Sequence, residues 1–372
     1  SYLALLGCGI AVQCLLQGVR SDYDAVNRAF QEVFGLRRNL YLGTIDPVSA
    51  SASVTGSISA PGFLAKYQAP LQAALRASLT SSAPPLGTML RYHMGWETPE
   101  GIATQAGSGK GLRPALCLFT CEAIGGSPSK AMAAAVALEL IHNFSLIHDD
   151  IQDLDMERHG RPTVWAVWGK PKALVAGNSM RAYADATLYQ LEATGTTPEK
   201  TLEVLRVLTE CCLELIEGQY MDLNFEARMD VTPEEYLDMV SRKTGALIEA
   251  AMHLGAVLGG AEASQVAALA RCGRLLGLAF QARDDVLGIW GDTEVLGKAT
   301  GADIRRKKKS LPVLYSLTKA NKTQRKRLER LYNTPEELGD AAVEEVMGIL
   351  DVLDAHGYAQ SVAEEMQAKA TT

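Results

Sequence analysis

The sequence predicts an all-α protein, and three observations lead to that prediction. Apolar residues make up 47% of the 372 residues, Ala and Leu are abundant, and runs of β-branched residues are few. Residues 202–220 and 265–290 carry apolar side chains every three or four positions, as buried helices do. Pro follows Ser or Thr at the expected helix starts Pro128, Pro198, Pro233 and Pro335. We expect a bundle of about ten or more helices with one large core around a central cavity.

The first sixty residues do not follow this pattern. Residues 1–18 are apolar and uncharged, but they are too short and too polar for a membrane span and lack the basic leader of a signal peptide. Residues 46–57, rich in Ser and Ala, are typical of a flexible linker. We expect residues 1–60 to be an appendage whose role the sequence does not indicate, with no firm membrane anchor. Residues 61–372 then form the helical domain.

Two Asp-rich segments indicate a site for divalent cations. Asp149 and Asp153 are four residues apart in an apolar helix, so both side chains lie on one stripe, which begins at His142. The second segment contains Asp284 and Asp285. Carboxylates crowded together in an apolar setting are costly to desolvate unless cations lie between them. Mg²⁺ keeps waters and substrate phosphate oxygens, so we expect a Mg²⁺-bridged phosphate ester. An ordinary solvated acidic face is the alternative.

The net charge of −7 argues against nucleic acid as a partner, because proteins that bind phosphate backbones carry a basic patch or stripe. A phosphate ester can instead be recruited through divalent metal. Residues 305–309 form one basic run, and such runs are most often solvated loops.

The cysteines do not predict a disulfide framework. Their number is seven, and most lie in apolar helical stretches where free Cys acts as a small hydrophobe. Cys117 and Cys121 resemble half a zinc site, but no second pair at ligand spacing follows. We therefore expect a reducing, cytoplasmic setting.

Short motifs follow one another from about Phe63 to the C-terminus. In chain order they are GKGLRP at 109–114, IHNFSLIHDDIQD at 141–153, RHGRPTVW at 158–165, KTGAL at 243–247, FQARDD at 280–285, GK at 297–298, GAD at 301–303 and KKSLP at 308–312. In this order the motifs resemble those of the trans-type isoprenyl diphosphate synthases, most of all the geranylgeranyl diphosphate synthases. The resemblance implies an isoprenoid-synthase-type bundle around a central active-site cavity, a catalytic domain over residues 61–372, and a homodimer.

The resemblance also implies an enzyme that condenses isopentenyl diphosphate with an allylic diphosphate and releases pyrophosphate, with about three Mg²⁺ ions per site as Lewis acids. The catalytic residues it implies are Asp149, Asp150, Asp153, Lys243, Asp284 and Asp285, of which Asp149, Asp153 and Asp284 bind metal. The allylic diphosphate would contact Arg158, Lys243, Thr244, Gln281, Lys298 and Lys308, and isopentenyl diphosphate would contact Lys110, Arg113, His142 and His159. Within the basic run, Lys308 matches the loop over the allylic diphosphate, and we expect its neighbours to be solvated.

Three positions depart from the family pattern. His159 stands where most members have a second arginine, which puts one isopentenyl diphosphate contact in question. Asn178 replaces a supporting Asp, and Gly288 replaces the third acid of the second Asp-rich motif. We still expect activity, with altered affinity for isopentenyl diphosphate.

Product length follows from the residues below the metal site. Phe144 precedes Asp149 by five positions, just over one helical turn, so its ring would form the floor of the tunnel that holds the growing chain, with Ser145 beside it. No two-residue insertion separates Asp149 from Asp153, which favours the twenty-carbon geranylgeranyl product. Farnesyl or longer products remain alternatives, because Ala115 and Leu116 could alter the floor and Phe144 could only pack the core.

Two other functions fit a similar fold. A class I terpene cyclase needs the metal site but no isopentenyl diphosphate site, so Lys110, Arg113 and His142 argue against it, while His159 keeps it open. A non-catalytic partner subunit would be expected to lose the aspartates of the first motif, and all of them are present.

Overall fold

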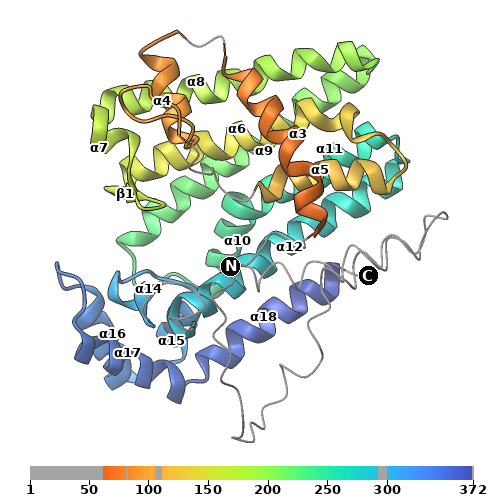
Figure 1. The fold of residues 1–372 in the computed structure, drawn as a ribbon. Helices are drawn as coiled ribbons and strands as arrows, with labels where there is room; N and C mark the ends of the chain where they lie inside the picture. The colour runs from red at the N-terminus through yellow and green to blue at the C-terminus, as the bar shows by residue number, and fades with distance from the viewer. Residues whose placement is uncertain (1–61, 81–82, 105–110, 292–299, 371–372) are drawn as a thin grey trace, which may run out of the picture.

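The computed structural model describes residues 62–80, 83–104, 111–291 and 300–370, and these confirm the predicted all-α bundle (Figure 1). The predicted appendage at 1–60, Lys110 and Lys298 lie outside the described residues. The elements are α3 (Gly62–Ser78), α4 (Leu86–His93), α5 (Leu112–Ala123), α6 (Pro128–Gln152), β1 (Glu157–Arg158), β2 (Arg161–Pro162), α7 (Val164–Trp168), α8 (Lys170–Leu188), η2 (Tyr189–Thr194), α9 (Pro198–Glu226), α10 (Pro233–Val240), η3 (Ser241–Gly245), α11 (Ala246–Gly259), α12 (Ala263–Trp290), α14 (Ala302–Arg305), α15 (Leu311–Lys319), α16 (Lys322–Tyr332), α17 (Asp340–Val352) and α18 (Ala355–Ala370).

Three of the four predicted helix starts are confirmed. Helices α6, α9 and α10 each begin at a Pro, which lacks the backbone N–H that a first turn leaves without a partner. The Thr197 side chain accepts from the backbone N–H of Lys200 at the start of α9. At α10, Thr232 and Glu235 form a reciprocal capping box.

The prediction of a helix start at Pro335 was wrong, because no helix begins there and α17 begins only at Asp340. The intervening segment bonds to the loop after α14 instead of to itself. Lys307 Nζ donates to the Thr334 carbonyl, and the Leu338 N–H donates to the carbonyl of Arg305. These tertiary partners replace the bonds that a first helical turn would make.

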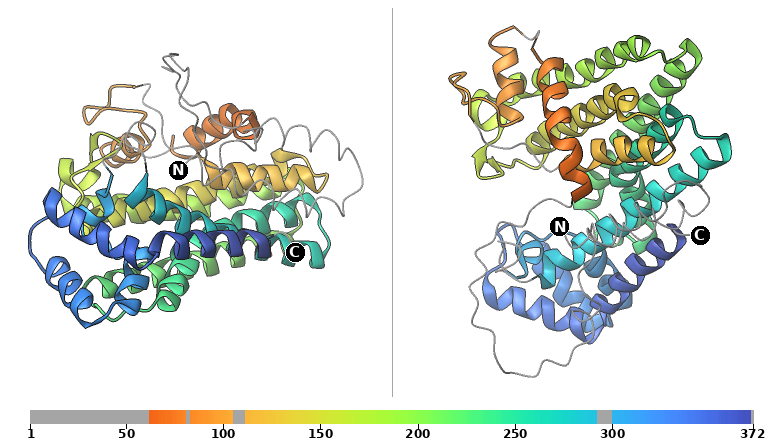
Figure 2. Two further views of the ribbon diagram at one scale, coloured as in Figure 1. Left: turned by 90° about the horizontal axis from the view of Figure 1, so that it is seen from below. Right: turned by 45° about the vertical axis from the view of Figure 1, so that its right-hand side comes forward.

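The buried apolar side chains form two clusters rather than the single core that we predicted. Helix α12 belongs to both, with Leu269 and Leu276 in the first cluster and Val286 and Ile289 in the second. In Figures 1 and 2, α12 runs between the two groups of helices, and α18 lies alongside it. Along α12 the boundary lies between Leu276 of the first cluster and Leu278, which packs against the second. Ala282, within the second Asp-rich motif, belongs to the second cluster.

Helix α6 is the central helix of the first cluster. It packs against α5, α8 and α11. By length and composition alone it is the one helix of the described residues that could cross a membrane, but 78% of its apolar window is buried inside the protein. Its apolar character is therefore accounted for by the protein core.

The π-helical turn η3 joins α10 to α11 and carries Lys243. It packs against α9 at Gly218, where an added Cβ would lie 2.4 Å from the Lys243 backbone nitrogen. Single π-helical turns are frequent at functional sites. This close contact brings Lys243 within reach of Asp222, one helical turn after Gly218, and the two side chains form an ion pair of 2.6 Å.

We expect Gly218→Ala to lower the free energy of unfolding by about 1–3 kcal/mol, because backbone atoms of η3 cannot move away as a flexible side chain could. Gly348→Ala is the matched control, since Gly348 is exposed inside α17 with nothing within 4 Å of an added Cβ. Gly348→Ala should raise the free energy of unfolding by about 0.5–1 kcal/mol, because Ala has the higher helix propensity. Urea unfolding of both variants measures the two effects, and equal effects would show that the contact at Gly218 is unimportant.

Candidate active site

The first Asp-rich segment lies at the C-terminal end of α6. Asp153 caps the helix, its N–H donating to the Asp149 carbonyl, and both side chains interact with Lys243 as their four-residue spacing predicts. Burial raises the pKa of Asp149 to about 6, with Lys243 opposing the rise and Asp153 adding to it. Burial disfavours the charge on Lys243, but Asp222 and Asp149 outweigh it and raise its pKa. The result is a partly buried cluster of three carboxylates and one ammonium group.

Asp222 was not among the predicted site residues. It lies in α9 between other acids, Glu217 and Glu226, and no sequence motif distinguishes it from them. Only the contact with Lys243 across η3 identifies it.

The second Asp-rich segment places its two acids in different surroundings. Asp285 is fully buried, and its carboxylate accepts four hydrogen bonds. The donors are Tyr236 Oη at 2.6 Å, the Leu311 backbone N–H at 3.1 Å, Gln281 Nε2 at 3.1 Å and Lys308 Nζ at 3.2 Å. Asp284 accepts no hydrogen bond from another described residue, and burial raises its pKa while Lys308 opposes the rise. The Asp285 carboxylate is thus bonded within the protein, whereas the Asp284 carboxylate has no hydrogen-bond donor among the described residues and is available to a ligand.

Lys308 connects Asp285 to Asp303. Its Nζ lies 3.2 Å from Asp285 Oδ1 and 3.3 Å from Asp303 Oδ2. Burial disfavours the ammonium form, but these two carboxylates and Asp284 raise the pKa of Lys308. Lys308 therefore presents a permanent positive charge beside Asp284, where the sequence predicted a contact for the allylic diphosphate.

The third acid that Gly288 lacks is replaced in space by Asp303. A Cβ built on Gly288 would lie 2.2 Å from Asp303 Oδ2, so the carboxylate from α14 occupies the position of the missing side chain. Gly288 is four residues after Asp284, on the same face of α12. The GAD motif contained Asp303, but the sequence did not indicate that its carboxylate lies against Gly288, which depends on how α14 packs against α12.

The prediction that the neighbours of Lys308 are solvated was wrong for three of them. Arg305 donates to the Leu338 carbonyl and to Asp340, and Lys307 donates to the Thr334 carbonyl. Lys309 Nζ donates to the carbonyls of Phe225, Glu226 and Arg228 at the C-terminal end of α9. A cation is favourable there because helix C-termini leave carbonyls without partners. The run therefore fixes its loop to the protein, and among the neighbours of Lys308 in the run Arg306 is the exposed one.

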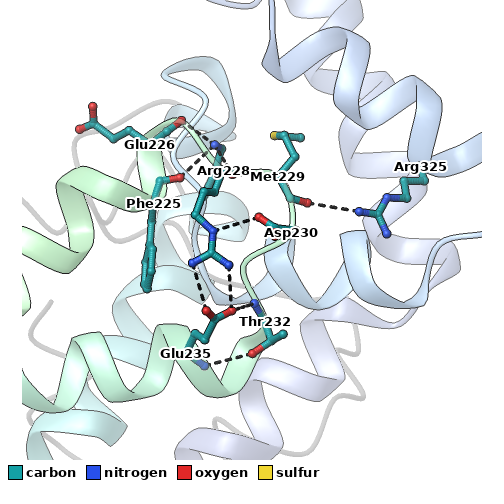
Figure 3. A network of polar contacts seen from close by, with 9 residues as sticks. Phe225, Glu226, Arg228, Met229, Asp230, Thr232, Glu235 and Arg325 are labelled. Carbon is teal, nitrogen blue, oxygen red and sulfur yellow. Dashed lines mark hydrogen bonds and ion pairs between the residues drawn. The ribbon is translucent and has the colours of Figure 1, made fainter.

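The segment 225–228, whose carbonyls accept hydrogen bonds from Lys309, is itself held by ion pairs (Figure 3). Arg228 donates to Asp230 at 3.0 Å and to Glu235 at 3.0 Å, and Glu235 also caps α10. Arg325 of α16 donates to the Met229 carbonyl. Lys308 is next to Lys309, so the α9–α10 connection holds the backbone that presents Lys308.

A separate pocket lies on another side of the end of α6. Its lining comes from α4, α6 and the β1–β2 hairpin: Tyr92, His93, Glu139, His142, Asn143, Leu146, Asp150, Arg158, His159, Arg161, Pro162, Thr163 and Val164. Asp150 is only 1% exposed and pairs with Arg158 at 2.7 Å. His159 and Gly160 form the hairpin tip with φ of 53° and 71°, the backbone of a two-residue type I′ turn. His159 therefore occupies a left-handed position that few side chains adopt.

The predicted pair Arg113 and His142 meets beside this pocket. Arg113 Nη1 donates to His142 Nε2 at 3.2 Å, which makes Nε2 the acceptor and the imidazole neutral. Burial, followed by the charge of Arg113, lowers the pKa of His142 well below its usual value. Arg113 Nε is buried without a partner among the described residues. A buried donor of this kind suits an anionic ligand.

Two pocket residues were missed by the sequence analysis, His93 and Arg161. Arg161 pairs with Arg158 across the hairpin, so strand alternation within the RHGRP motif could have indicated it. His93 lies at the end of α4, and no motif surrounds it. Its Nε2 is 3.1 Å from Asn143 Oδ1.

The remaining predicted residues lie around these two clusters. Thr244 donates to Gln281 at 3.4 Å and so joins η3 to α12. Phe144 is buried and packs edge-on against His148, with ring centroids 4.8 Å apart. The Ser145 hydroxyl donates to the His142 carbonyl. Asn178 is exposed on α8.

Comparison with known proteins agrees with this arrangement. Residues 102–350 match the family model of polyprenyl synthetase. The chain is 39% identical to a short chain isoprenyl diphosphate synthase of Methanothermobacter thermautotrophicus, over 81% of this chain and 87% of that protein. It is 37% identical to a geranylgeranyl diphosphate synthase of Mycobacterium tuberculosis, over 86% and 90% of the two chains. The crystal structure of a polyprenyl synthetase from Streptomyces coelicolor A3(2) superposes with a TM-score of 0.77 at 36% identity, covering 83% of this chain and 91% of that one. The resemblance seen in the motifs is confirmed, and the chain belongs to the polyprenyl synthetase family.

Proposed function

We propose that this protein is a Mg²⁺-dependent head-to-tail prenyltransferase that joins an allylic diphosphate to isopentenyl diphosphate and releases pyrophosphate. The observation that supports this most is the presence of two anion-binding environments at the end of one helix. Asp149, Asp153 and Lys243 form one, with carboxylates suited to metal, and the pocket of Arg158 and the histidines forms the other. Two diphosphates bound at these two places would bring their prenyl groups together.

The carboxylates fit Mg²⁺. Asp149, Asp153 and Asp284 accept no side-chain hydrogen bond from other described residues, and burial raises the pKa of each, so their charges lack compensation. No three His, Cys, Asp or Glu groups of the described chain lie together as a complete metal cage. Mg²⁺ does not require one, because it is held by one or two carboxylates together with waters and phosphate oxygens. When bound, about three ions would stabilise the charge on departing pyrophosphate as Lewis acids.

The protein's own cations would hold the allylic diphosphate. Lys243 lies beside the first carboxylates, and Lys308 lies beside Asp284. Arg158 is fixed by Asp150 between this site and the pocket. As the allylic carbon–oxygen bond breaks, negative charge grows on the diphosphate, and these fixed charges stabilise it most where water is excluded. Lys298, Thr244 and Gln281 would complete this site. Asp150 and Asp285 would act by positioning Arg158 and Lys308.

The second diphosphate would bind without metal. Arg113, with its buried unpartnered Nε, and His142 lie next to the pocket, and His159 lines it. Lys110 would join them. A terpene cyclase would have no use for this second anion site, which favours the synthase.

We expect Asp149→Asn to lower turnover at least about 100-fold, and EDTA to abolish it, because the charge on the leaving group would lose its stabilisation. The assay combines purified protein, Mg²⁺ and isopentenyl diphosphate with dimethylallyl, geranyl or farnesyl diphosphate, and identifies products by chain length. Asp238→Asn, an exposed acid on α10, should retain full activity. Cyclic products formed without isopentenyl diphosphate would instead identify a cyclase. No turnover at all would favour a non-catalytic partner subunit.

We propose geranylgeranyl diphosphate as the product, with Phe144 as the floor of the tunnel. Phe144→Ala should then shift the products to longer chains, because the space of the ring becomes available to the prenyl tail. Ser145→Phe should shift them to shorter chains. Chromatography of the dephosphorylated products measures both shifts. Unchanged product length in a Phe144→Ala protein that still melts cooperatively would leave Phe144 as core packing only.

We also propose a homodimer formed through α8 and α9. Leu202, Leu213, Ile216 and Tyr220 lie on one face of α9 and are 47–69% exposed, and Leu174 and Val175 are exposed on α8. A contiguous exposed apolar face of this kind marks an interaction surface, and closed symmetric dimers are the commonest assembly. The five described cysteines are all free and buried, which supports the reducing cytoplasm as the setting.

Replacing Leu213 and Ile216 together by Glu should convert the dimer to a monomer, because burying two uncompensated charges in an interface is costly. Val352→Glu is the control, since Val352 is 76% exposed on α17, far along the chain from this face. Sedimentation velocity measures whether each variant has the mass of a dimer or of a monomer. A double variant that still sediments as the wild type would place the interface elsewhere.

A further inference from the structure

We propose that His93 is a further binding residue for isopentenyl diphosphate and that it takes up a proton from solvent when this substrate binds. This inference rests on the proposed function of the pocket. It adds one residue to the substrate site and couples that site to pH.

His93 is held firmly at the pocket wall. Arg161 donates to the carbonyls of Tyr92 at 3.0 Å and His93 at 3.4 Å, and its guanidinium lies over the Tyr92 ring. The Tyr92 hydroxyl donates back to the Pro162 carbonyl at 2.6 Å. The end of α4 and the β1–β2 hairpin therefore fix each other. These bonds fix the backbone of His93 at the pocket wall, and the contact of Nε2 with Asn143 Oδ1 at 3.1 Å holds the ring.

The hydrogen bonds of Asn143 determine which nitrogen of His93 carries the proton. Asn143 Nδ2 donates to the Glu139 carbonyl at 2.8 Å and to Glu139 Oε1 at 3.3 Å, so its Oδ1 is the atom that faces His93. His93 Nε2 must then donate, and Nδ1 is left with a lone pair. A phosphate oxygen is also an acceptor. It can bond to Nδ1 only after that nitrogen has gained a proton.

The free pocket keeps His93 neutral. Burial lowers its pKa to about 3, and Arg158 and Arg161 lower it as well, while the bond to Asn143 opposes them. The other titratable groups of the pocket are Glu139, His142 and Asp150 from α6 and His159 from the hairpin, and Asp150 is already paired with Arg158.

A bound diphosphate reverses this balance. An opposite charge within about 4–6 Å shifts a pKa by about 1–3 toward the charged form, and a diphosphate brings several negative charges. The pKa of His93 therefore rises on binding. Proton uptake means that affinity for isopentenyl diphosphate falls as pH rises between the pKa of His93 in the free protein, about 3, and its raised pKa in the complex, about 4–6. A protonated His93 would supply the cation that His159, in place of the family's second arginine, does not.

The test is calorimetric titration with isopentenyl diphosphate at pH 5, without Mg²⁺ or allylic substrate, in buffers of different ionisation enthalpy. The wild type should take up about one more proton per site than His93→Gln. Protons that the substrate itself exchanges are common to both proteins and cancel. In steady-state assays, His93→Gln should raise KM for isopentenyl diphosphate about tenfold while KM for the allylic substrate stays unchanged. His253→Gln, on α11 away from the pocket, should match the wild type in every respect.

Equal proton counts in the wild type and His93→Gln would overturn the inference. If His93→Gln does not fold, the pH dependence of KM in the wild type tests the inference by itself. Its KM for isopentenyl diphosphate should rise between pH 5 and pH 6.5, opposite to the effect of ionising the substrate, and a constant or falling KM would also refute the role of His93. A protein that turns over substrates without these proton effects retains the proposed function and loses only this inference. Absence of both turnover and isopentenyl diphosphate binding would instead remove the proposed function.

Discussion

The part of the candidate site around Asp284 and Lys308 depends on one buried carboxylate, that of Asp285. A charged group without exposure costs several kcal/mol unless its oxygens are fully bonded, and here four donors from four parts of the chain meet it. Tyr236 comes from α10, Gln281 from α12 itself, Lys308 from the loop, and the Leu311 N–H from the first turn of α15. Removing this carboxylate would take a hydrogen-bond partner from Tyr236, Gln281 and the Leu311 N–H and would leave Lys308 paired with Asp303. The position of Lys308 relative to Asp284 follows from this network.

The end of α6 separates the two substrate environments with adjacent residues. Asp149 and Asp150 are neighbours in sequence, but on a helix they point about 100° apart. Asp149 interacts with Lys243, whereas Asp150 binds Arg158 at the wall of the histidine pocket. One helix terminus therefore carries a carboxylate face on one side and an arginine-rich face on the other. The two diphosphate sites that we propose, one with metal and one without, would therefore lie on different faces of one helix end.

Features that depend on local sequence could be predicted, and features that depend on folded loops could not. Helical periodicity identified α9 and α12. The four-residue spacing of Asp149 and Asp153 predicted that both side chains lie on one stripe of the helix, and both interact with Lys243. The failures share a physical cause. Lys309 and its neighbours look solvated in sequence because their acceptors, backbone carbonyls, are present in every residue and leave no sequence signal. His93 was missed for the same reason, since its partner Asn143 is fifty positions away.

The glycine at position 288 sets how closely α14 can lie against α12. An added Cβ there would be 2.2 Å from Asp303 Oδ2, so any larger side chain would push that carboxylate out of its place. Asp303 would then move away from Lys308 Nζ, which now lies 3.3 Å from it, and the ammonium group would keep Asp285 as its ion-pair partner. One missing side chain therefore decides how the positive charge beside Asp284 is balanced.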